Sequence, residues 1–222
     1  MARPRSDIAP RVVHAARARF LHDGVDGASL RQIAQDARTS IGMVYYYFPT
    51  KDDLFLAVVE ETYAGVLEKM TAALAPPGAV EERIGQLYRV LGALTGDEIT
   101  TVRLVVREAL VSSNRLSRLL DRFQRGHLSL VAGVLSEGVQ TGHIDPRHPF
   151  PVLLAVTFAM GAASQLLLRV AGDRLPLAAM VHPDTLPDQL VYALFHGIGA
   201  PAAPAEPEAP PPPRARKKRP PR

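Results

Sequence analysis

The 222-residue sequence contains no cysteine, which excludes disulfide bonds, cysteine-ligated zinc sites and thiol catalysis. A chain without cysteine is compatible with a reducing cytoplasm. Gly-rich phosphate loops and nucleophile motifs are also absent. No segment alternates apolar and polar residues between hairpin turns. The sequence therefore predicts an all-α protein that is not an enzyme and needs no cofactor.

Signals for membranes and metals are equally scarce. The charged N-terminus is not followed by an apolar run of the kind found in secretory signals. The apolar run over residues 152–168 falls short of the about 20 residues that span a bilayer, so we expect a helix buried on most sides. His143 and His148 flank a proline turn, but no carboxylate cluster completes a metal site. We expect neither a metal nor a membrane among the partners.

Charge is distributed unevenly along the chain. Residues 1–50 hold seven arginines against four acids, residues 51–199 hold thirteen basic residues against sixteen acids, and residues 200–222 hold six against two. The ends are thus basic and the middle is mildly acidic. Basic ends would bind a polyanionic partner, and an acidic body would be repelled by it.

Helical periodicity runs through the chain, beginning with Ile8, Val12, Ala16 and Phe20 on one face. Ser6 or Asp7 can cap this first helix, and Gly24 ends it. Ser29 caps a second helix, and a third runs from about residue 40 to 47 after a break of about three residues. Thr50 caps a long fourth helix that ends before Pro76. Later helices are expected at about residues 80–95, 98–113, 115–125, 126–141, 150–171 and 187–197.

The two short helices of residues 29–48 have the spacing of a helix-turn-helix, whose second helix can enter a DNA major groove. Ile41, Val44 and Phe48 supply an apolar side that would hold this helix on the domain. Met43, Tyr46 and Tyr47 point away from that side, and no acid lies between Asp36 and Asp52. The alternative is a small three-helix core in which the tyrosines only pack.

The N-terminal segment resembles the tetracycline-repressor-like (TetR) family over about residues 6–66. The resemblance lies in a dozen positions at fixed spacing: Val12, Val13, Ala15, Ala16, Phe20 and Gly24, then residues 29–34, then residues 42–54. It implies a DNA-binding regulator with a helix-turn-helix domain over residues 1–50. It also implies a larger helical domain for ligand binding and dimerisation over residues 51–199.

The resemblance also implies which residues meet DNA. Arg31 would reach a phosphate or a base edge, the start of the recognition helix would meet bases, and two tyrosine hydroxyls and a lysine would contact the backbone. The implied contacts are Arg31, Ser40, Ile41, Gly42, Met43, Tyr45, Tyr47 and Lys51. Periodicity alone would place Tyr45 with the buried side. The family commonly has Gly then Val in the turn, where this chain has Arg38 and Thr39, so the turn could differ in shape.

Two further groups in the helical body are candidate sites. Arg103 and Arg107 share a helix face, either as a solvated or ion-paired face or as the anchor for an anionic ligand in an apolar cavity. Small residues at helical spacing and leucines of the last helix form either a dimer interface or an ordinary core. These residues are Ala155, Ala159, Ala162, Ala163, Leu190 and Leu194.

Residues 200–222 hold nine prolines and end in a basic cluster, which predicts a disordered arm. The sequence as a whole predicts a cytoplasmic, nucleoid-associated homodimer that binds a palindromic operator. An unidentified small molecule would relieve its repression. The rival interpretation is a helical interaction protein that binds nucleic acid or anionic surfaces nonspecifically through this tail.

Overall fold

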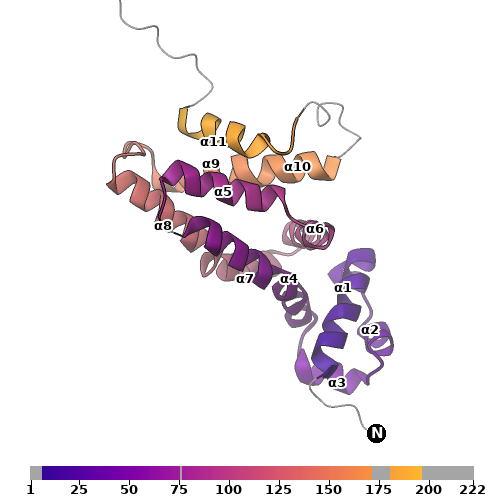
Figure 1. Cartoon of the computed structure of the whole chain (residues 1–222). Helices are drawn as coiled ribbons and strands as arrows, with labels where there is room; N and C mark the ends of the chain where they lie inside the picture. Colours follow the sequence, from indigo (N-terminus) through magenta and orange to yellow (C-terminus); the bar gives the residue numbers. More distant parts are fainter. Residues whose placement is uncertain (1–6, 76, 172–180, 197–222) are drawn as a thin grey trace, which may run out of the picture.

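The computed structural model describes residues 7–75, 77–171 and 181–196. The structure is 81% helical and has no strand in these ranges, which confirms the all-α prediction. A small N-terminal unit lies at one end of a long helix, α4, and a larger helical body surrounds the other end (Figure 1). The tail of residues 200–222 and the candidate cap Ser6 lie outside the described residues.

The N-terminal unit consists of α1 (Ile8–Gly27), α2 (Leu30–Asp36) and α3 (Ile41–Tyr47). The predicted end of α1 at Gly24 is instead an interruption, since the helix continues to Gly27; the φ of 76° and ψ of 166° at Gly24 are open to glycine but strained for other residues. Asp7 precedes α1, but its side chain caps no amide, which corrects that expectation. Its carboxylate instead pairs with Arg11 at 3.2 Å.

The periodic apolar face of α1 forms the first core. Val12, Ala16 and Phe20 are fully buried, and the Phe20 ring meets Phe55 of α4 edge-on at 6.5 Å. Burial of each large side chain contributes about 1.5–3 kcal/mol. The same core includes Leu104 and Leu119 from the body, so apolar packing continues across the predicted domain boundary at residue 50.

The long helix α4 (Lys51–Leu74) begins with a complete capping box, as Thr50 predicted. The Thr50 hydroxyl accepts from the Asp53 amide at 3.0 Å, and the Asp53 carboxylate accepts from the Thr50 amide at 3.0 Å. Both residues thereby satisfy amides that a helix start leaves without partners. This fixes where the helix leaves the N-terminal unit.

The body contains α5 (Val80–Gly92), α6 (Gly96–Val111), α7 (Ser113–Gln124), α8 (His127–Gln140), α9 (Phe150–Phe158), α10 (Ser164–Ala171) and α11 (Leu186–His196). These bounds follow the predicted ranges closely. A second core surrounds Tyr88 of α5, which is fully buried. Helix α5 lies between α4 and the outer pair α10 and α11 (Figure 1).

The expected helix over residues 150–171 is interrupted by a π-helical turn, η2 (Ala159–Ala163). A Cβ on Gly161 would lie 2.0 Å from the Tyr88 ring, so the backbone passes directly over that ring. Gln165 Nε2 donates to the carbonyl oxygens of Tyr88 and Gly161, both at 2.9 Å. A contact between distant segments therefore accompanies the wider turn, which helical periodicity could not reveal.

The same stretch corrects two further expectations. Phe150–Arg169 forms 20 helical residues, long and apolar enough by length and composition to cross a membrane. The predicted length was too short because Phe150, Pro151 and Arg169 also belong to the helical stretch. Only 17% of its apolar window is buried, so the helix is not enclosed on most sides. An apolar face of α9 and α10 is therefore left on the surface.

Candidate nucleic-acid interface and ligand cavity

The helix-turn-helix of residues 29–48 is built by two serine caps. The Ser29 hydroxyl accepts from the Gln32 amide at 3.5 Å, and the Ser40 hydroxyl accepts from the Met43 amide at 3.3 Å. Each cap fixes the first residue of a seven-residue helix. Local signals in the sequence therefore set the start of both α2 and α3.

The turn between the two helices takes the left-handed geometry at Arg38, with φ of 51°. No other non-glycine residue in the described ranges has a positive φ. The Thr39 amide donates to the Ala34 carbonyl at 2.9 Å. From α1, Arg11 Nη1 donates to the Ala37 carbonyl at 2.6 Å. The substitution of arginine for the family's glycine therefore leaves a left-handed turn in place.

Helix α3 has one inner and one outer side, as predicted. Val44 is fully buried, and Ile41 and Phe48 pack against the first core. Tyr45 and Tyr46 are 53% and 76% exposed. For Tyr45 the buried position expected from periodicity alone is therefore wrong, and the exposed side chain is compatible with the DNA contact that the family resemblance implies.

The remaining implied DNA contacts lie on or beside this outer side. Arg31, Ser40 and Gly42 are exposed, while Ile41, Met43 and Tyr47 are partly buried. The Tyr47 ring meets the Tyr46 ring edge-on at 5.2 Å. Helix α3 carries no charged side chain, and the cations nearest to it in sequence are Arg38 in the turn and Lys51 at the start of α4.

Lys51, at the start of α4, is held against the end of α1. Its Nζ donates to the Asp26 carbonyl oxygen at 2.9 Å. An ammonium has three donor hydrogens, so this bond leaves capacity for a phosphate.

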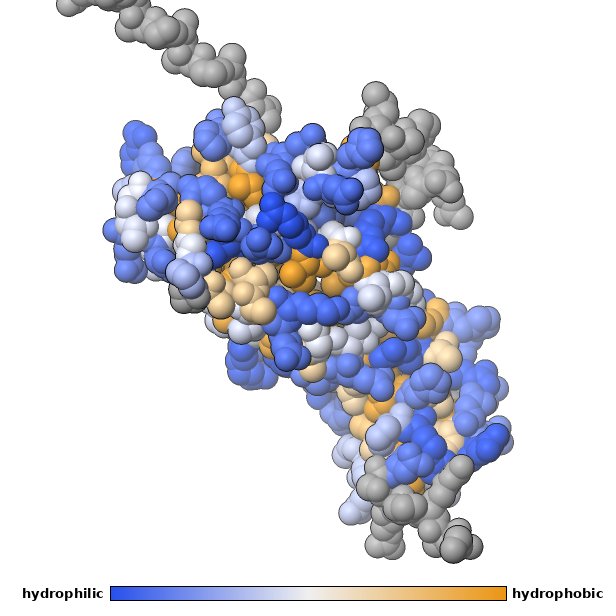
Figure 2. Space-filling view, viewed as in Figure 1, coloured by the Kyte–Doolittle hydropathy of each residue, from blue (hydrophilic) through white to orange (hydrophobic). Residues whose placement is uncertain are grey.

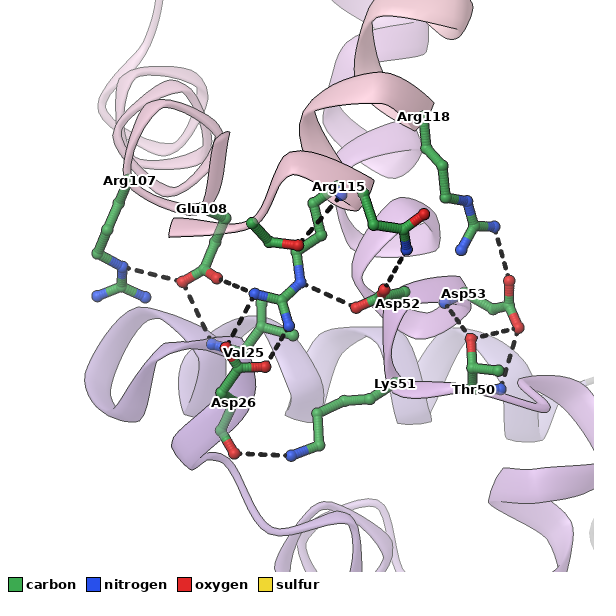
Figure 3. A network of polar contacts seen from close by, with 12 residues as sticks. Val25, Asp26, Thr50, Lys51, Asp52, Asp53, Arg107, Glu108, Arg115 and Arg118 are labelled. Atoms are coloured by element: carbon green, nitrogen blue, oxygen red, sulfur yellow. Dashed lines mark hydrogen bonds and ion pairs between the residues drawn. The ribbon is translucent and has the colours of Figure 1, made fainter. Parts of the chain in front are cut away.

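A buried polar network joins the N-terminal unit to the body (Figure 3). Its centre is Arg115 of α7, whose side chain is 6% exposed. The guanidinium binds Glu108 of α6 at 2.8 Å, Asp52 of α4 at 2.8 Å, and the Asp26 carboxylate. These bonds raise the pKa of Arg115, and the bond to Arg115 lowers the pKa of Asp26. None of these four residues was a candidate from the sequence, because their partners lie up to 89 positions apart.

Arg103 and Arg107, the candidate anchors for an anionic ligand, do not lie where a ligand anchor was expected. Both are exposed. Arg107 donates to the carbonyls of Phe20 and Leu21 and to Glu108, so it joins α6 to α1. Neither residue lines the apolar cavity of the body.

That cavity has a volume of about 460 Å³, which is within the usual range for small-molecule sites. Apolar side chains of α4, α5, α6, α7, α9 and α10 form most of its wall, and Figure 2 shows apolar surface along the seam between α5 and α4. The polar residues of the lining are Thr62, Tyr63, Glu98, Thr101 and His127. The body therefore contains an apolar cavity, but α4 also lines it and its polar groups do not include Arg103 or Arg107.

The predicted dimer residues fall into two groups. Ala155, Ala159 and Ala163 are exposed on one side of α9 and η2, and Ala162 is partly buried beside them. Ala159, Ala162 and Ala163 also line the cavity. Leu190 and Leu194 instead pack against the second core, because that side of α11 faces α5.

The chain matches the family model of bacterial regulatory proteins of the tetR family over residues 12–58. It is 24% identical over 135 residues to the fatty acid metabolism regulator protein of Bacillus subtilis strain 168, covering 60% of this chain and 69% of the relative. It is 28% identical over 153 residues to the HTH-type transcriptional regulator RutR of Escherichia coli K12, covering 66% of this chain and 70% of the relative.

Solved structures show the same fold. FadR from Bacillus subtilis, crystallised in complex with stearoyl-CoA, matches with a TM-score of 0.65 at 20% identity. The match covers 86% of this chain and 99% of that one.

These relatives are transcriptional regulators, and regulators of this kind are soluble cytoplasmic DNA-binding proteins. The comparisons do not favour the rival interpretation of a nonspecific interaction protein. Over residues 12–58 the chain therefore carries the DNA-binding domain of the tetR family of bacterial regulatory proteins, and it is a DNA-binding transcriptional regulator rather than an enzyme.

Proposed function

We propose that two copies of this chain bind a palindromic operator through α2 and α3, and that an apolar ligand in the cavity releases them. The observation that carries the proposal is the outer side of α3, where Tyr45 and Tyr46 project from a helix without acids. One such helix reads only a few base pairs, so specific binding requires two half-sites. Bound to its operators, the protein would associate with the nucleoid and act as a repressor.

In this proposal the residues of the helix-turn-helix divide into two roles. Arg31, Ser40, Ile41, Gly42 and Met43 lie where α2 and the start of α3 would meet base edges or nearby phosphates. The hydroxyls of Tyr45 and Tyr47 and the ammonium of Lys51 bind backbone phosphates. These phosphate contacts fix the register of α3 in the groove without reading sequence.

The surface of α9 and α10 supports the dimer. Val152, Val156 and Leu167 are 50%, 41% and 61% exposed, beside the exposed Ala155 and Ala159. A contiguous apolar surface of this kind is unfavourable in water and marks an interface. A second copy of the same surface, related by a two-fold axis, covers it in a self-complementary way.

The ligand is proposed to be a fatty acyl compound. One relative is named for fatty acid metabolism, and the solved FadR structure contains stearoyl-CoA. An acyl chain suits a cavity whose lining is almost entirely apolar. Cavity residues such as Val105 and Phe123 lie on α6 and α7. The same helices hold Glu108 and Arg115, so movement at the ligand can reach the DNA-binding unit.

Fluorescence anisotropy tests the proposal with labelled DNA that flanks the protein's own gene. We expect this duplex to bind at least about a thousandfold more tightly than a shuffled duplex of equal length and composition. Stearoyl-CoA should weaken that binding, whereas coenzyme A without the acyl chain should not. Equal affinity for both duplexes would overturn specific operator binding, and an equal effect of coenzyme A would overturn the acyl ligand.

A further inference from the structure

The polar residues of the ligand cavity differ in how many of their hydrogen-bonding groups already have partners. The Thr101 hydroxyl donates to the Asp97 carbonyl at 3.1 Å. The Thr62 hydroxyl lies 3.1 Å from Thr101 Oγ1 and accepts from Arg17. With the Thr101 proton committed to Asp97, Thr62 donates to Thr101. Neither threonine therefore retains a proton for a ligand.

Glu98 also lines the cavity, and each of its two carboxylate oxygens already accepts a hydrogen bond. It accepts from Lys69 Nζ at 2.7 Å and from the Thr95 amide at 2.6 Å. Burial raises the pKa of Glu98, but the hydrogen bonds from Lys69 and Thr95 outweigh it and leave the pKa below its usual value. The carboxylate thus stays negative, which disfavours an anionic group inside the cavity.

The fifth polar residue, His127, has one ring nitrogen with a partner and one without. Its Nδ1 lies 2.9 Å from the Tyr63 hydroxyl, and the His127 amide donates to the same hydroxyl at 3.2 Å. The described residues provide no other acceptor for the Tyr63 proton. Tyr63 must therefore donate to Nδ1, since the reverse arrangement would leave a buried phenol proton without an acceptor.

This assignment places the imidazole proton on Nε2. The ring is surrounded by Phe123 and Phe158, with centroids at 5.0 and 5.4 Å, and no described residue bonds to Nε2. Burial lowers the pKa of His127 to about 4, so the ring is neutral at physiological pH. It is therefore an uncharged donor on an apolar wall.

We infer that His127 is the polar anchor of the cavity, and that its Nε2–H donates to an uncharged carbonyl oxygen of the ligand. An ester or thioester oxygen fits this site, because a neutral donor in a cavity that also contains the Glu98 carboxylate suits a neutral acceptor better than a carboxylate. The inference rests on the proposed apolar ligand and adds which end of that ligand is recognised.

Isothermal titration calorimetry with three ten-carbon probes tests this inference: methyl decanoate, decyl methyl ether and decanoate. For the wild-type protein we expect the ester to bind about tenfold more tightly than either other probe, the effect of one hydrogen bond. His127→Phe should bring the ester-to-ether ratio to about one, because it keeps the ring and removes the donor. His127→Gln should restore part of the ratio through its amide hydrogens.

His22→Phe is the matched control, since His22 is 86% exposed and lies on α1 away from the cavity. It should leave the ratio unchanged. Equal binding of ester and ether to the wild-type protein would overturn the role of His127 while leaving the apolar cavity intact, whatever the stability of the variants. Failure of both neutral probes to bind the wild-type protein would overturn the ligand proposal together with this inference.

Discussion

Arg115 Nη1 lies 2.8 Å from Glu108 Oε2, and the two side chains are only 6% and 3% exposed. The pair joins the end of α6 to the start of α7. Glu108 also accepts from the Val25 amide at 3.2 Å, and Arg115 also binds Asp52. A single buried ion pair thus connects α6 and α7 of the helical body to the end of α1 and the start of α4.

Removing one partner of this pair should strongly destabilise the protein. Arg115→Met leaves Glu108 buried with only Arg107 as a charged partner, and we expect a loss of about 3 kcal/mol in the free energy of unfolding by urea. The control is Arg118→Met, whose ion pair with Asp53 is about one-third exposed and should contribute about 1 kcal/mol or less. Equal losses in the two variants would contradict a central role for Arg115.

The left-handed turn at Arg38 makes a second prediction. Arg38→Gly should stabilise the protein relative to Arg38→Ala by about 1 kcal/mol, because both remove the side chain but only glycine relieves the strain. Chemical denaturation of the two variants measures this difference. If the Arg38→Ala variant is as stable as the Arg38→Gly variant, the turn is not strained at this position.

Local signals account for the parts of the fold that were predicted. Val12 and Phe20 are buried because their spacing places them on one helix face. Ser29, Ser40 and Thr50 start their helices because each cap needs only an amide two or three residues away. These interactions can be inferred from a few neighbouring residues.

The features that were missed depend on contacts between distant segments. Arg115 meets Asp26 across 89 positions, and His127 meets Tyr63 across 64. The π turn follows the contact between Gly161 and Tyr88. Charge and periodicity describe one element at a time. They could therefore not predict that Arg107 packs against α1, or that it does not line the cavity.

The proposed phosphate contacts can be tested by salt dependence. Lys51→Ala should weaken binding to specific and random DNA about equally and lower the slope of log affinity against log salt by about 1. Tyr47→Ala should weaken binding with a smaller change in slope, since it removes no charge. Circular dichroism should show that both variants stay folded.

Arg103→Ala is the matched control for charge, because Arg103 is exposed on α6 rather than on the helix-turn-helix. It should leave the salt slope unchanged. A slope that stays the same in Lys51→Ala would contradict the proposed position of Lys51 against DNA.

The proposed dimer makes a prediction about one exposed leucine. Leu167→Glu places a charge on the apolar surface of α10 and should shift the protein toward monomer in sedimentation velocity at micromolar concentration. Leu110→Glu is the control, because Leu110 is even more exposed, at 84%, but lies on α6. A monomeric Leu110→Glu and a dimeric Leu167→Glu would assign the interface to another face.

The buried imidazole of His127 predicts how stability depends on pH. Burial lowers its pKa to about 4 in the folded protein, against about 6.5 for an unperturbed histidine. Between these values the unfolded chain binds a proton that the folded protein does not, so the free energy of unfolding falls as pH decreases from 6.5 to 4. His127 should account for a loss of up to about 3 kcal/mol over this range.

Urea denaturation of wild-type protein and His127→Phe at several pH values measures this loss, because phenylalanine removes this proton uptake. The difference between the two stability curves should slope from pH 6.5 to 4 and be flat above pH 7, and His22→Phe should show no such slope. A difference that is flat throughout would mean that His127 is not held neutral by burial beside Tyr63.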